Sequence, residues 1–509
     1  MTLPRTSPHG RDALAAIDMG SNSFRLEIAQ LHRGQYKRLL YLKDTVRLGA
    51  GLDEQCNLTE AAMQRGLDCL QRFAAELGGM APNRVRAVAT QTLREARNRN
   101  AFLERAQAAL GYPIEIISGR EEARLIFAGV SRLQPSEAPR LVIDIGGRST
   151  EMILGQGSRP LQAESFQIGS VSMSLRYFAD GRFTAEGLRA GQIAAGAELE
   201  EAFALFSRQN ARPRWVEALG SSGTVGAVSQ VLAASGQTDG SITPEALRWC
   251  MERCLEAGHV EALKLPGLKD DRRAVVAGGL CILYTLLTQF GIERLQPAKG
   301  ALRQGVVFDL AERLEAQRLG LENGHDMRDQ SVQALQQRFD VDPEQAQRVQ
   351  AQALALYKQL LPRASAESQR ELGWAAALHE IGMMVSHHDH HRHSAYLLAH
   401  VDAAGFSQSQ LRRLGDLALG QRGGLRKLEE QLKDEGLLWQ LLALRLAVVK
   451  CHAREAVDSG AMRLRRQGRL VQISLPRGWL DAHPRSAFLL REEIEAWARF
   501  GAVALSLAD

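Results

Sequence analysis

The chain has 509 residues, 45% of them hydrophobic, and a formal net charge of +5. This length exceeds what one hydrophobic core supports, so several domains are expected. No apolar run is long enough to span a bilayer, which excludes a transmembrane helix. The mild positive charge suits an anionic ligand without requiring nucleic acid, and the 6% aromatic content is low for a surface that stacks single-stranded bases.

The six cysteines are scattered, with no C-x-x-C pair, and residues 1–12 are polar. The cysteine pattern favours a reducing compartment over a disulfide scaffold. The polar start gives no indication of a secretory signal. We therefore expect a cytoplasmic protein.

Three strands are predicted at the start of the chain, at residues 13–17, 24–30 and 36–42. Asp18 follows the first strand, and a short turn of glycine and hydroxyl-bearing residues leads into the second. Such a turn can present N–H groups and hydroxyls to phosphate oxygens, and the carboxylate can hold Mg²⁺. The polar residues of this turn are Ser21, Asn22 and Ser23.

The first half of the chain then alternates helices and strands, which is typical of α/β domains. Helical periodicity over 59–77 begins after Thr59, a residue suited to the N-cap position. The elements predicted next are a strand at 84–90, a helix at 93–110, a strand at 114–117 and a helix at 120–130.

Two further positions in this half could act on a phosphate. Arg94 lies just beyond a strand, where its guanidinium could bind phosphate oxygens; a solvent-exposed helix start is the equal alternative. The helix at 120–130 opens with Glu121 and Glu122. Acids in the first turn interact favourably with the helix dipole, so helix stabilisation is the simpler interpretation. Alternatively, one of them orients or deprotonates an attacking water.

The three-strand pattern restarts at residue 140, with Asp144 placed as Asp18 is, and this predicts an internal duplication of architecture. A hairpin with an Asx-type turn explains either motif alone. Two such motifs in equivalent positions favour a pair of phosphate-binding turns with a divalent metal between them. After Asp144, the second turn and the start of its next strand contain Gly146, Gly147, Arg148, Ser149, Thr150 and Glu151.

A third glycine–hydroxyl turn, at 218–224, lies between a predicted strand and a helix. Helix N-termini bind anions, so Ser222, Gly223 and Thr224 are candidates for a phosphate contact. Helix capping by Ser222 or Thr224 explains the pattern nearly as well.

The element pattern predicts an α/β fold class and four units. Residues 1–135 and 136–312 are two similar α/β lobes, residues 313–460 are helical, and residues 461–509 return to strand–helix–strand.

Together, the two aspartate turns, SGREEARLIF (118–127) and GSSGT (220–224) resemble the exopolyphosphatase and guanosine pentaphosphate phosphohydrolase family. The resemblance covers essentially the whole chain. It implies duplicated ribonuclease-H-like lobes of the actin-like ATPase superfamily, which includes sugar kinases and Hsp70. An HD-like all-α domain, a small C-terminal α/β domain and a homodimer are also implied.

The resemblance also assigns roles to residues. Glu122 matches the catalytic base or water-orienting acid, and Asp144 and Glu151 match acids of the Mg²⁺ network, with Asp18 facing them. A monovalent cation such as K⁺ is a second candidate cofactor. The expected phosphate-binding residues are Ser21, Asn22, Ser23, Arg94, Gly146, Gly147, Arg148, Ser149, Thr150, Ser222, Gly223 and Thr224.

Arg148 departs from the family pattern, which has a third glycine there. An arginine would be strained if this position required a positive φ. If it does not, the arginine could add a cation beside a polyanionic substrate, and we expect this second outcome.

Seven of the thirteen histidines fall between His379 and His400. An HD-type metal set needs a His-Asp pair, whereas this chain has His379–Glu380, so we expect no second catalytic centre. Solvent-exposed loop histidines, or histidines that touch a polyanion, explain the run better. Basic residues at 412–413, 422, 426–427 and 463–469 could line a path for polyphosphate, or could simply be scattered solvated charge.

The expected function is that of an exopolyphosphatase, which removes terminal orthophosphate processively from inorganic polyphosphate with Mg²⁺. Hydrolysis of guanosine pentaphosphate at the same site is the nearest alternative. An ATP-dependent kinase or chaperone-like ATPase is disfavoured by the glutamate helix. A non-catalytic polyphosphate or nucleotide sensor remains open because of Arg148.

Overall fold

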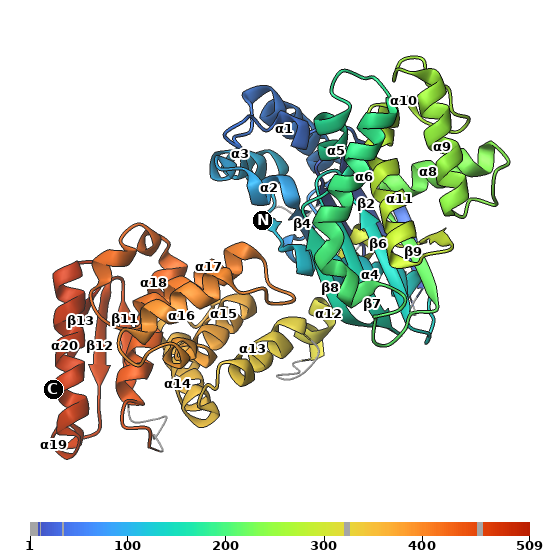
Figure 1. Cartoon of the computed structure of the whole chain (residues 1–509). Helices are drawn as coiled ribbons and strands as arrows, with labels where there is room; N and C mark the ends of the chain where they lie inside the picture. Colours follow the sequence, from blue (N-terminus) through green and yellow to red (C-terminus); the bar gives the residue numbers. More distant parts are fainter. Residues whose placement is uncertain (1–8, 11, 33–34, 320–325, 456–461, 509) are drawn as a thin grey trace. The chain divides into compact units, whose positions relative to one another are not determined.

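The computed structural model describes residues 9–10, 12–32, 35–319, 326–455 and 462–508, without the side chains of 317–319. The chain divides into two compact units, Met1–Glu315 and Ala316–Asp509 (Figure 1). Within the described residues, no helix combines the length and the apolar character needed to cross a membrane.

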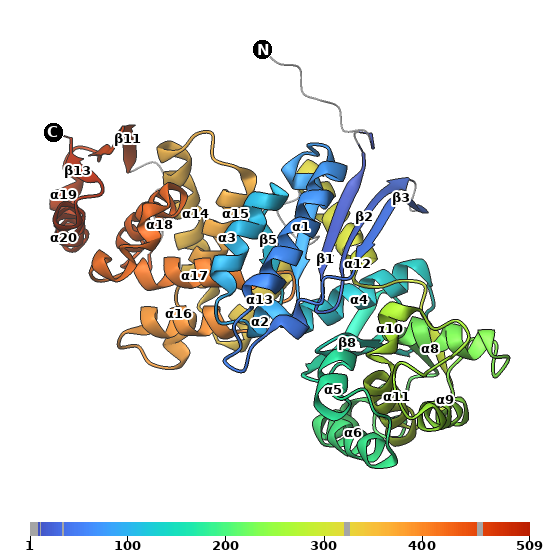
Figure 2. The same cartoon turned by 90° about the horizontal axis from the view of Figure 1, so that it is seen from above.

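The N-terminal unit contains two five-stranded sheets with matching strand order, β3-β2-β1-β4-β5 and β8-β7-β6-β9-β10. In each sheet the first three strands form an antiparallel meander, and the other two run parallel to the first strand. The predicted duplication is confirmed, and the arrangement is that expected of an actin-like α/β fold. Figure 2 shows β1, β2 and β3 side by side.

The strands of the first sheet are β1 (Leu14–Met19), β2 (Phe24–His32), β3 (Gln35–Asp44), β4 (Val85–Ala89) and β5 (Ile114–Ile116). Those of the second are β6 (Arg140–Ile145), β7 (Thr150–Gln156), β8 (Arg159–Phe166), β9 (Glu217–Ser221) and β10 (Leu295–Pro297).

The helices of this unit confirm most of the predicted elements. Thr59 caps α1 (Glu60–Leu77) by accepting a hydrogen bond from the Ala62 N–H. The single helix predicted at 93–110 is wrong, because the chain breaks it into α2 (Gln91–Glu95) and α3 (Arg99–Leu110). The others are α4 (Gly119–Leu133), α5 (Ser170–Tyr177), α6 (Ala185–Leu199), α7 (Phe203–Phe206), α8 (Ser222–Ala234), α9 (Pro244–Ala257), α10 (Asp270–Arg273), α11 (Val276–Phe290) and α12 (Leu302–Leu319).

The alternation of side chains along the strands decides which face each aspartate occupies. In β1, Ala15 and Ile17 pack into the core that includes α1 and α3, whereas Leu14 and Ala16 face the opposite side. That opposite side is a central core, which both sheets share with α4 and α12. Asp18 continues the Leu14–Ala16 series, so it lies on the central face.

The second sheet repeats this arrangement. Val142 of β6 and Ile153 of β7 belong to the central core, whereas Leu141 and Ile143 face the other side. By the same alternation, Asp144 lies on the central face at the end of β6. The two aspartates therefore approach the space beside α4 from opposite sheets.

Two glycines allow α4 and α12 to cross with their backbones in contact. A Cβ on Gly305 would lie 1.7 Å from the Leu125 carbonyl oxygen, and a Cβ on Gly129 would lie 2.3 Å from the Ala301 oxygen. Since both obstacles are backbone atoms, they cannot move aside as a flexible side chain could. This crossing fixes α4, and with it the glutamates of its first turn.

The C-terminal unit is mostly helical, as predicted, and its relation to an HD fold stays a prediction. Its hairpin β11–β12 and strand β13 form a three-stranded sheet, and α20 packs on β13 (Figure 1). The basic stretch 463–469 contains β11 and the turn of this hairpin. The predicted strand–helix–strand pattern accounts for β12, α20 and β13 but did not include β11. The elements are α13 (Met327–Arg338), α14 (Pro343–Leu360), α15 (Ala366–Ala377), α16 (His390–His400), α17 (Gln408–Gly420), α18 (Glu435–Lys450), β11 (Arg463–Gln467), β12 (Leu470–Ser474), α19 (Trp479–Ala482), α20 (Pro484–Phe500) and β13 (Ala504–Leu507).

The histidine run is only partly solvent-exposed. His379 is buried, and so are His390 and His391 in the first turn of α16, which corrects the prediction of loop histidines for these positions. Across the described residues, no three His, Cys, Asp or Glu side chains converge as a metal-binding group.

Gly305→Ala should destabilise the N-terminal unit, because its new methyl group would overlap the Leu125 carbonyl oxygen. Overpacking of this kind costs about 1–3 kcal/mol, which a lower urea midpoint would report. Gly226→Ala in α8 is the matched control, since a Cβ there meets nothing within 4 Å. We expect that change to be neutral or to stabilise by about 0.5–1 kcal/mol. Equal midpoints for the two variants would contradict the close helix crossing.

Candidate active site

The turns after β1 and β6 face each other across a cavity of about 500 Å³ in the N-terminal unit. They come close together at Gly147, where a Cβ would lie 3.1 Å from the Ser21 Cβ and 3.5 Å from the Asn22 nitrogen. Asp18, Asp144 and Glu122 line the cavity together. The structure therefore brings together the three acids that the sequence placed on separate motifs.

The acids of the site repel one another in a buried setting. Burial raises the pKa of Glu122 to about 7, Arg94 opposes the rise, and Asp144 and Asp18 add to it. Burial also raises the pKa of Asp144 to about 6, against hydrogen bonding from Ser221 and the charge of Arg25. The pKa of Glu151 lies well above its usual range because of burial and the nearby Glu122 and Asp144. Added positive charge in this site would therefore favour the ionised carboxylates.

The structure distinguishes Glu122 from its neighbour Glu121. Glu121 accepts bonds of 2.7 and 2.8 Å from Arg124, which is also bonded to Asp309 of α12 at 2.5 Å. Glu121 is thus part of a buried ion-pair network between α4 and α12. Glu122 instead lines the cavity, where Arg94 Nη1 donates to its Oε2 at 2.9 Å.

Several buried polar atoms around the site have no hydrogen-bond partner. Buried polar groups are normally paired, so each exception calls for an explanation such as an absent ion or ligand. Four of these atoms carry N–H or O–H donors, and the fifth is a carboxylate oxygen. They are Asn22 Nδ2, Ser23 Oγ, Thr92 Oγ1, Arg94 Nη2 and Glu151 Oε2. The donors suit phosphate oxygens, and the carboxylate oxygen suits a cation.

A group of basic residues, which the sequence analysis missed, also lines the cavity. They greatly outnumber the three lining carboxylates, and positive charge stays in excess even after the ion pairs Lys43–Asp271 and Arg303–Glu27 are allowed for. No turn motif indicates them, because they come from strands, loops and helices far apart in the chain. They are Arg25, Arg38, Lys43, Lys269, Arg272, Lys299 and Arg303.

Two of these basic residues lie close enough to repel each other. The pKa of Arg272 is lowered by burial and by the positive charge of Arg25. Arg272 also lies against the third turn, where a Cβ on Gly223 would come within 2.2 Å of its Nη2. The α8 N-terminus and two repelling guanidinium groups make this end of the cavity attractive to an anion.

Other predicted residues have different positions. Ser21, Asn22, Ser23, Gly146, Gly147, Ser149, Ser222, Gly223 and Thr224 line the cavity. The Thr224 hydroxyl, however, is used in a bond to the Ile145 oxygen (2.9 Å), and the Ser222 hydroxyl accepts from the Thr224 N–H (3.2 Å) in the first turn of α8. Thr150 faces away from the central core and donates to the Ile168 oxygen at 2.6 Å, so its predicted phosphate contact is wrong.

Arg148 is neither strained nor a free cation beside the cavity. It is absent from the residues with positive φ, and it does not line the cavity. Its Nε and Nη2 donate to Glu95 Oε2 at 2.9 and 2.6 Å, and its Nη1 donates to the Gly49 oxygen at 3.2 Å. The expected extra cation is therefore corrected to an ion pair between the second turn and the first lobe.

This ion pair begins a continuous chain of hydrogen bonds. Glu95 Oε1 accepts from Gln91 Nε2 at 2.7 Å, and Gln91 Oε1 accepts from Arg94 Nε at 2.9 Å. Arg94 in turn holds Glu122. The second turn is thereby linked, through α2, to the glutamate in the cavity.

The donor set fits a magnesium ion held by few protein ligands. Asp18 is paired with Arg25 (3.0 Å) and Arg303 (3.5 Å), which leaves Asp144 and Glu151 as the better candidates. Mg²⁺ commonly binds through one or two carboxylates and completes its shell with water and substrate phosphate. The unpartnered Glu151 Oε2 and the raised pKa values agree with such a site.

Comparison with known proteins decides the family. The model of the Ppx/GppA phosphatase family matches residues 27–314, and that of Ppx/GppA phosphatase domain III matches residues 327–494. The chain belongs to the Ppx/GppA phosphatase family. It is therefore a hydrolase of that family, as the motifs predicted.

The chain is similar over nearly its whole length to proteins named guanosine-5'-triphosphate,3'-diphosphate pyrophosphatase. The one from Aeromonas hydrophila is 35% identical, covering 97% of this chain and 98% of the relative. The one from Photobacterium profundum is 35% identical, covering 94% and 95%.

Solved structures agree with the Ppx/GppA fold. An exopolyphosphatase-like protein has a TM-score of 0.53 at 25% identity, covering 60% of this chain and 99% of that one. An exopolyphosphatase from Cytophaga hutchinsonii has a TM-score of 0.52 at 24% identity, covering 58% and 97%.

A double-mutant cycle tests the ion pair between Arg148 and Glu95. Each side chain is 21% exposed, so we expect Arg148→Met and Glu95→Gln to be coupled by about 1 kcal/mol in urea unfolding. The more exposed pair Arg105–Glu60 is the control and should couple more weakly. Additive effects of the two changes at Arg148 and Glu95 would show that the pair contributes nothing.

Proposed function

We propose that this protein hydrolyses the terminal phosphoanhydride bond of guanosine pentaphosphate and releases orthophosphate. The observation that carries the reaction type is that Glu122 lines a cationic cavity together with two turns, the first of which has unpartnered donors at Asn22 and Ser23. The nucleotide substrate is supported by the names of relatives that match almost the whole chain at 35% identity.

In this mechanism the terminal phosphoryl group lies between the two turns. The Asn22 amide and the Ser23 and Ser149 hydroxyls donate to its oxygens, and basic residues such as Arg25 and Arg272 bind the remaining phosphates. Glu122 accepts a proton from a water as the water oxygen forms a bond to phosphorus. The bond from phosphorus to the bridging oxygen breaks, and the shortened substrate leaves with that oxygen.

The remaining acids and Arg94 support this step. Asp144 and Glu151 would hold Mg²⁺, which when bound neutralises charge on the phosphate oxygens. Arg94 keeps the Glu122 carboxylate in place through Nη1, and its free Nη2 can donate to the phosphoryl group. A role for K⁺ and a homodimer stay predictions.

Inorganic polyphosphate is the second candidate substrate, and the sequence analysis ranked it first. The excess of basic residues along the cavity favours it, because a polyanion would meet several cations at once. The comparison of kcat/KM for guanosine pentaphosphate and for polyphosphate of defined length decides between them. A higher value for polyphosphate would overturn the nucleotide proposal and leave the reaction type intact.

Glu122→Gln should lower kcat by about 10²–10⁴-fold, because the amide cannot accept the proton of water. Phosphate release measures the effect. Glu121→Gln, one position earlier on α4, is the matched control. It should lower the melting temperature through the buried Arg124 network and leave kcat within a few-fold. If Glu122→Gln releases phosphate at the wild-type rate, the assignment of the base fails.

Activity should depend on pH through Glu122. Its pKa is raised to about 7, and only the ionised form can accept a proton, so kcat should rise as the pH increases through about 7. Cations favour the ionised form, so higher Mg²⁺ should shift the midpoint to lower pH. A kcat profile measured at two Mg²⁺ concentrations checks this. A flat profile between pH 5.5 and 8 would contradict the assigned role.

A further inference from the structure

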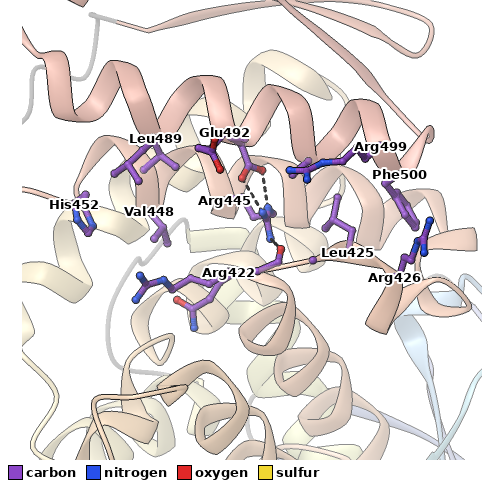
Figure 3. Close-up of a pocket in the computed structure, with 16 residues that line it drawn as sticks. Arg422, Leu425, Arg426, Arg445, Val448, His452, Leu489, Glu492, Arg499 and Phe500 are labelled. Atoms are coloured by element: carbon purple, nitrogen blue, oxygen red, sulfur yellow. Dashed lines mark hydrogen bonds and ion pairs between the residues drawn. The ribbon is translucent and has the colours of Figure 1, made fainter.

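The C-terminal unit contains a second cavity, of about 650 Å³, which the proposed reaction does not use. Helices α18 and α20 form two of its walls, and the segment 421–426 after α17 closes it from below (Figure 3). All sixteen lining residues belong to this unit. The volume is in the range of small-molecule sites.

A buried ion pair forms the scaffold of this cavity. Arg445 donates to Glu493 at 2.6 and 2.7 Å and to the Gly420 and Gly423 oxygens at 2.6 and 3.0 Å. Trp497 also donates to Glu493, at 2.6 Å. Because Arg445 and Glu493 satisfy each other, this pair holds the walls in place and leaves no net charge for a ligand.

Three other arginines leave an excess of positive charge around the cavity. Among the described residues, Arg422 and Arg426 have no carboxylate partner, and the only side-chain bond of Arg499 is a long one to the Glu495 backbone oxygen (3.4 Å). Glu492 is the one other lining acid. Figure 3 shows the three arginines around one cavity. Guanidinium groups in such an arrangement suit an anion with several oxygens.

The rest of the lining is apolar and incompletely covered. Val448, Val449, Leu489, Ala496 and Phe500 are only half-buried where they meet the cavity. His452 and Phe500 lie at opposite ends of it, so each end presents a flat ring (Figure 3). Covering this surface with an apolar or planar group would be favourable.

The two kinds of lining together restrict the ligand. Inorganic phosphate chains would pair with the arginines but leave the apolar wall exposed. An uncharged apolar ligand would cover the wall but desolvate the guanidinium groups without compensation. A ligand that has a planar ring and a multiply charged phosphate group satisfies both.

From this combination we infer that the cavity between α18, α20 and residues 421–426 binds a nucleoside phosphate. Its phosphates contact Arg422, Arg426 and Arg499, and its base covers the apolar wall. This site is separate from the cavity of the proposed reaction, since it shares no residue with it.

The test uses the full chain and the photoreactive probe 8-azido-adenosine diphosphate, with labelled peptides identified by mass spectrometry. Labelling is expected in peptides from 421–452 or 484–500. The double variant Arg422→Ala/Arg426→Ala should reduce that labelling at least tenfold. The matched control, Arg485→Ala/Arg491→Ala, removes two exposed arginines outside the cavity. The extent of its labelling should be within twofold of that of the wild type.

Competition identifies the ligand class. Unlabelled ADP should protect these peptides, whereas tripolyphosphate or oleate at the same concentration should not. The inference is overturned by label confined to peptides of the N-terminal unit, by equal labelling of the two double variants, or by equal protection from tripolyphosphate or oleate. None of these outcomes bears on the role of Glu122, because that role is tested by a different measurement, the release of phosphate by Glu122→Gln.

Discussion

The backbone contact between α4 and α12 is the constraint on which the N-terminal unit depends. Gly129 and Gly305 let the two helices cross so closely that carbonyl oxygens occupy the space of a side chain. Both helices share a core with the two sheets, so each sheet packs against the same pair of helices. The first turn of α4, which carries Glu121 and Glu122, is therefore positioned by both lobes at once.

Burying acids on that central face is costly, and the structure offsets the cost only in part. Asp18 and Glu122 have guanidinium partners, whereas Asp144 and Glu151 depend mainly on hydroxyl groups and on distant charge. Burial above all, and repulsion between the acids in addition, raise the pKa values of Glu122, Asp144 and Glu151. Unpartnered donors lie around the same cavity, so the site has groups that suit an anion as well as carboxylates that suit a cation. The proposed phosphate with a divalent metal would satisfy both sets of groups.

Much of this site could be predicted because its signals are local in sequence. An aspartate at the end of a strand, a glycine turn and a capped helix each depend on a few neighbouring residues, so Asp18, Asp144 and Glu122 were found. Thr150 was misassigned because its orientation follows strand alternation, which turns it away from Asp144's face. The helix pattern alone did not separate Glu121 from Glu122, and the family resemblance favoured Glu122. The physical reason, a network that occupies Glu121, involves Asp309 of α12, almost two hundred residues further along the chain. The basic lining of the cavity is equally non-local.

Arg148 shows how a departure from a family pattern can be accommodated without loss of the site. A glycine at this position would give the turn freedom, whereas the arginine donates two hydrogen bonds to Glu95 and ties the turn to α2. Because Glu95, Gln91 and Arg94 continue the chain to Glu122, the arginine adds support to the Glu122 carboxylate. A lysine could not do the same, since it lacks the planar fork that reaches Glu95 and the Gly49 oxygen together. The guanidinium of Arg148 therefore pairs with Glu95 of the protein and not with the substrate.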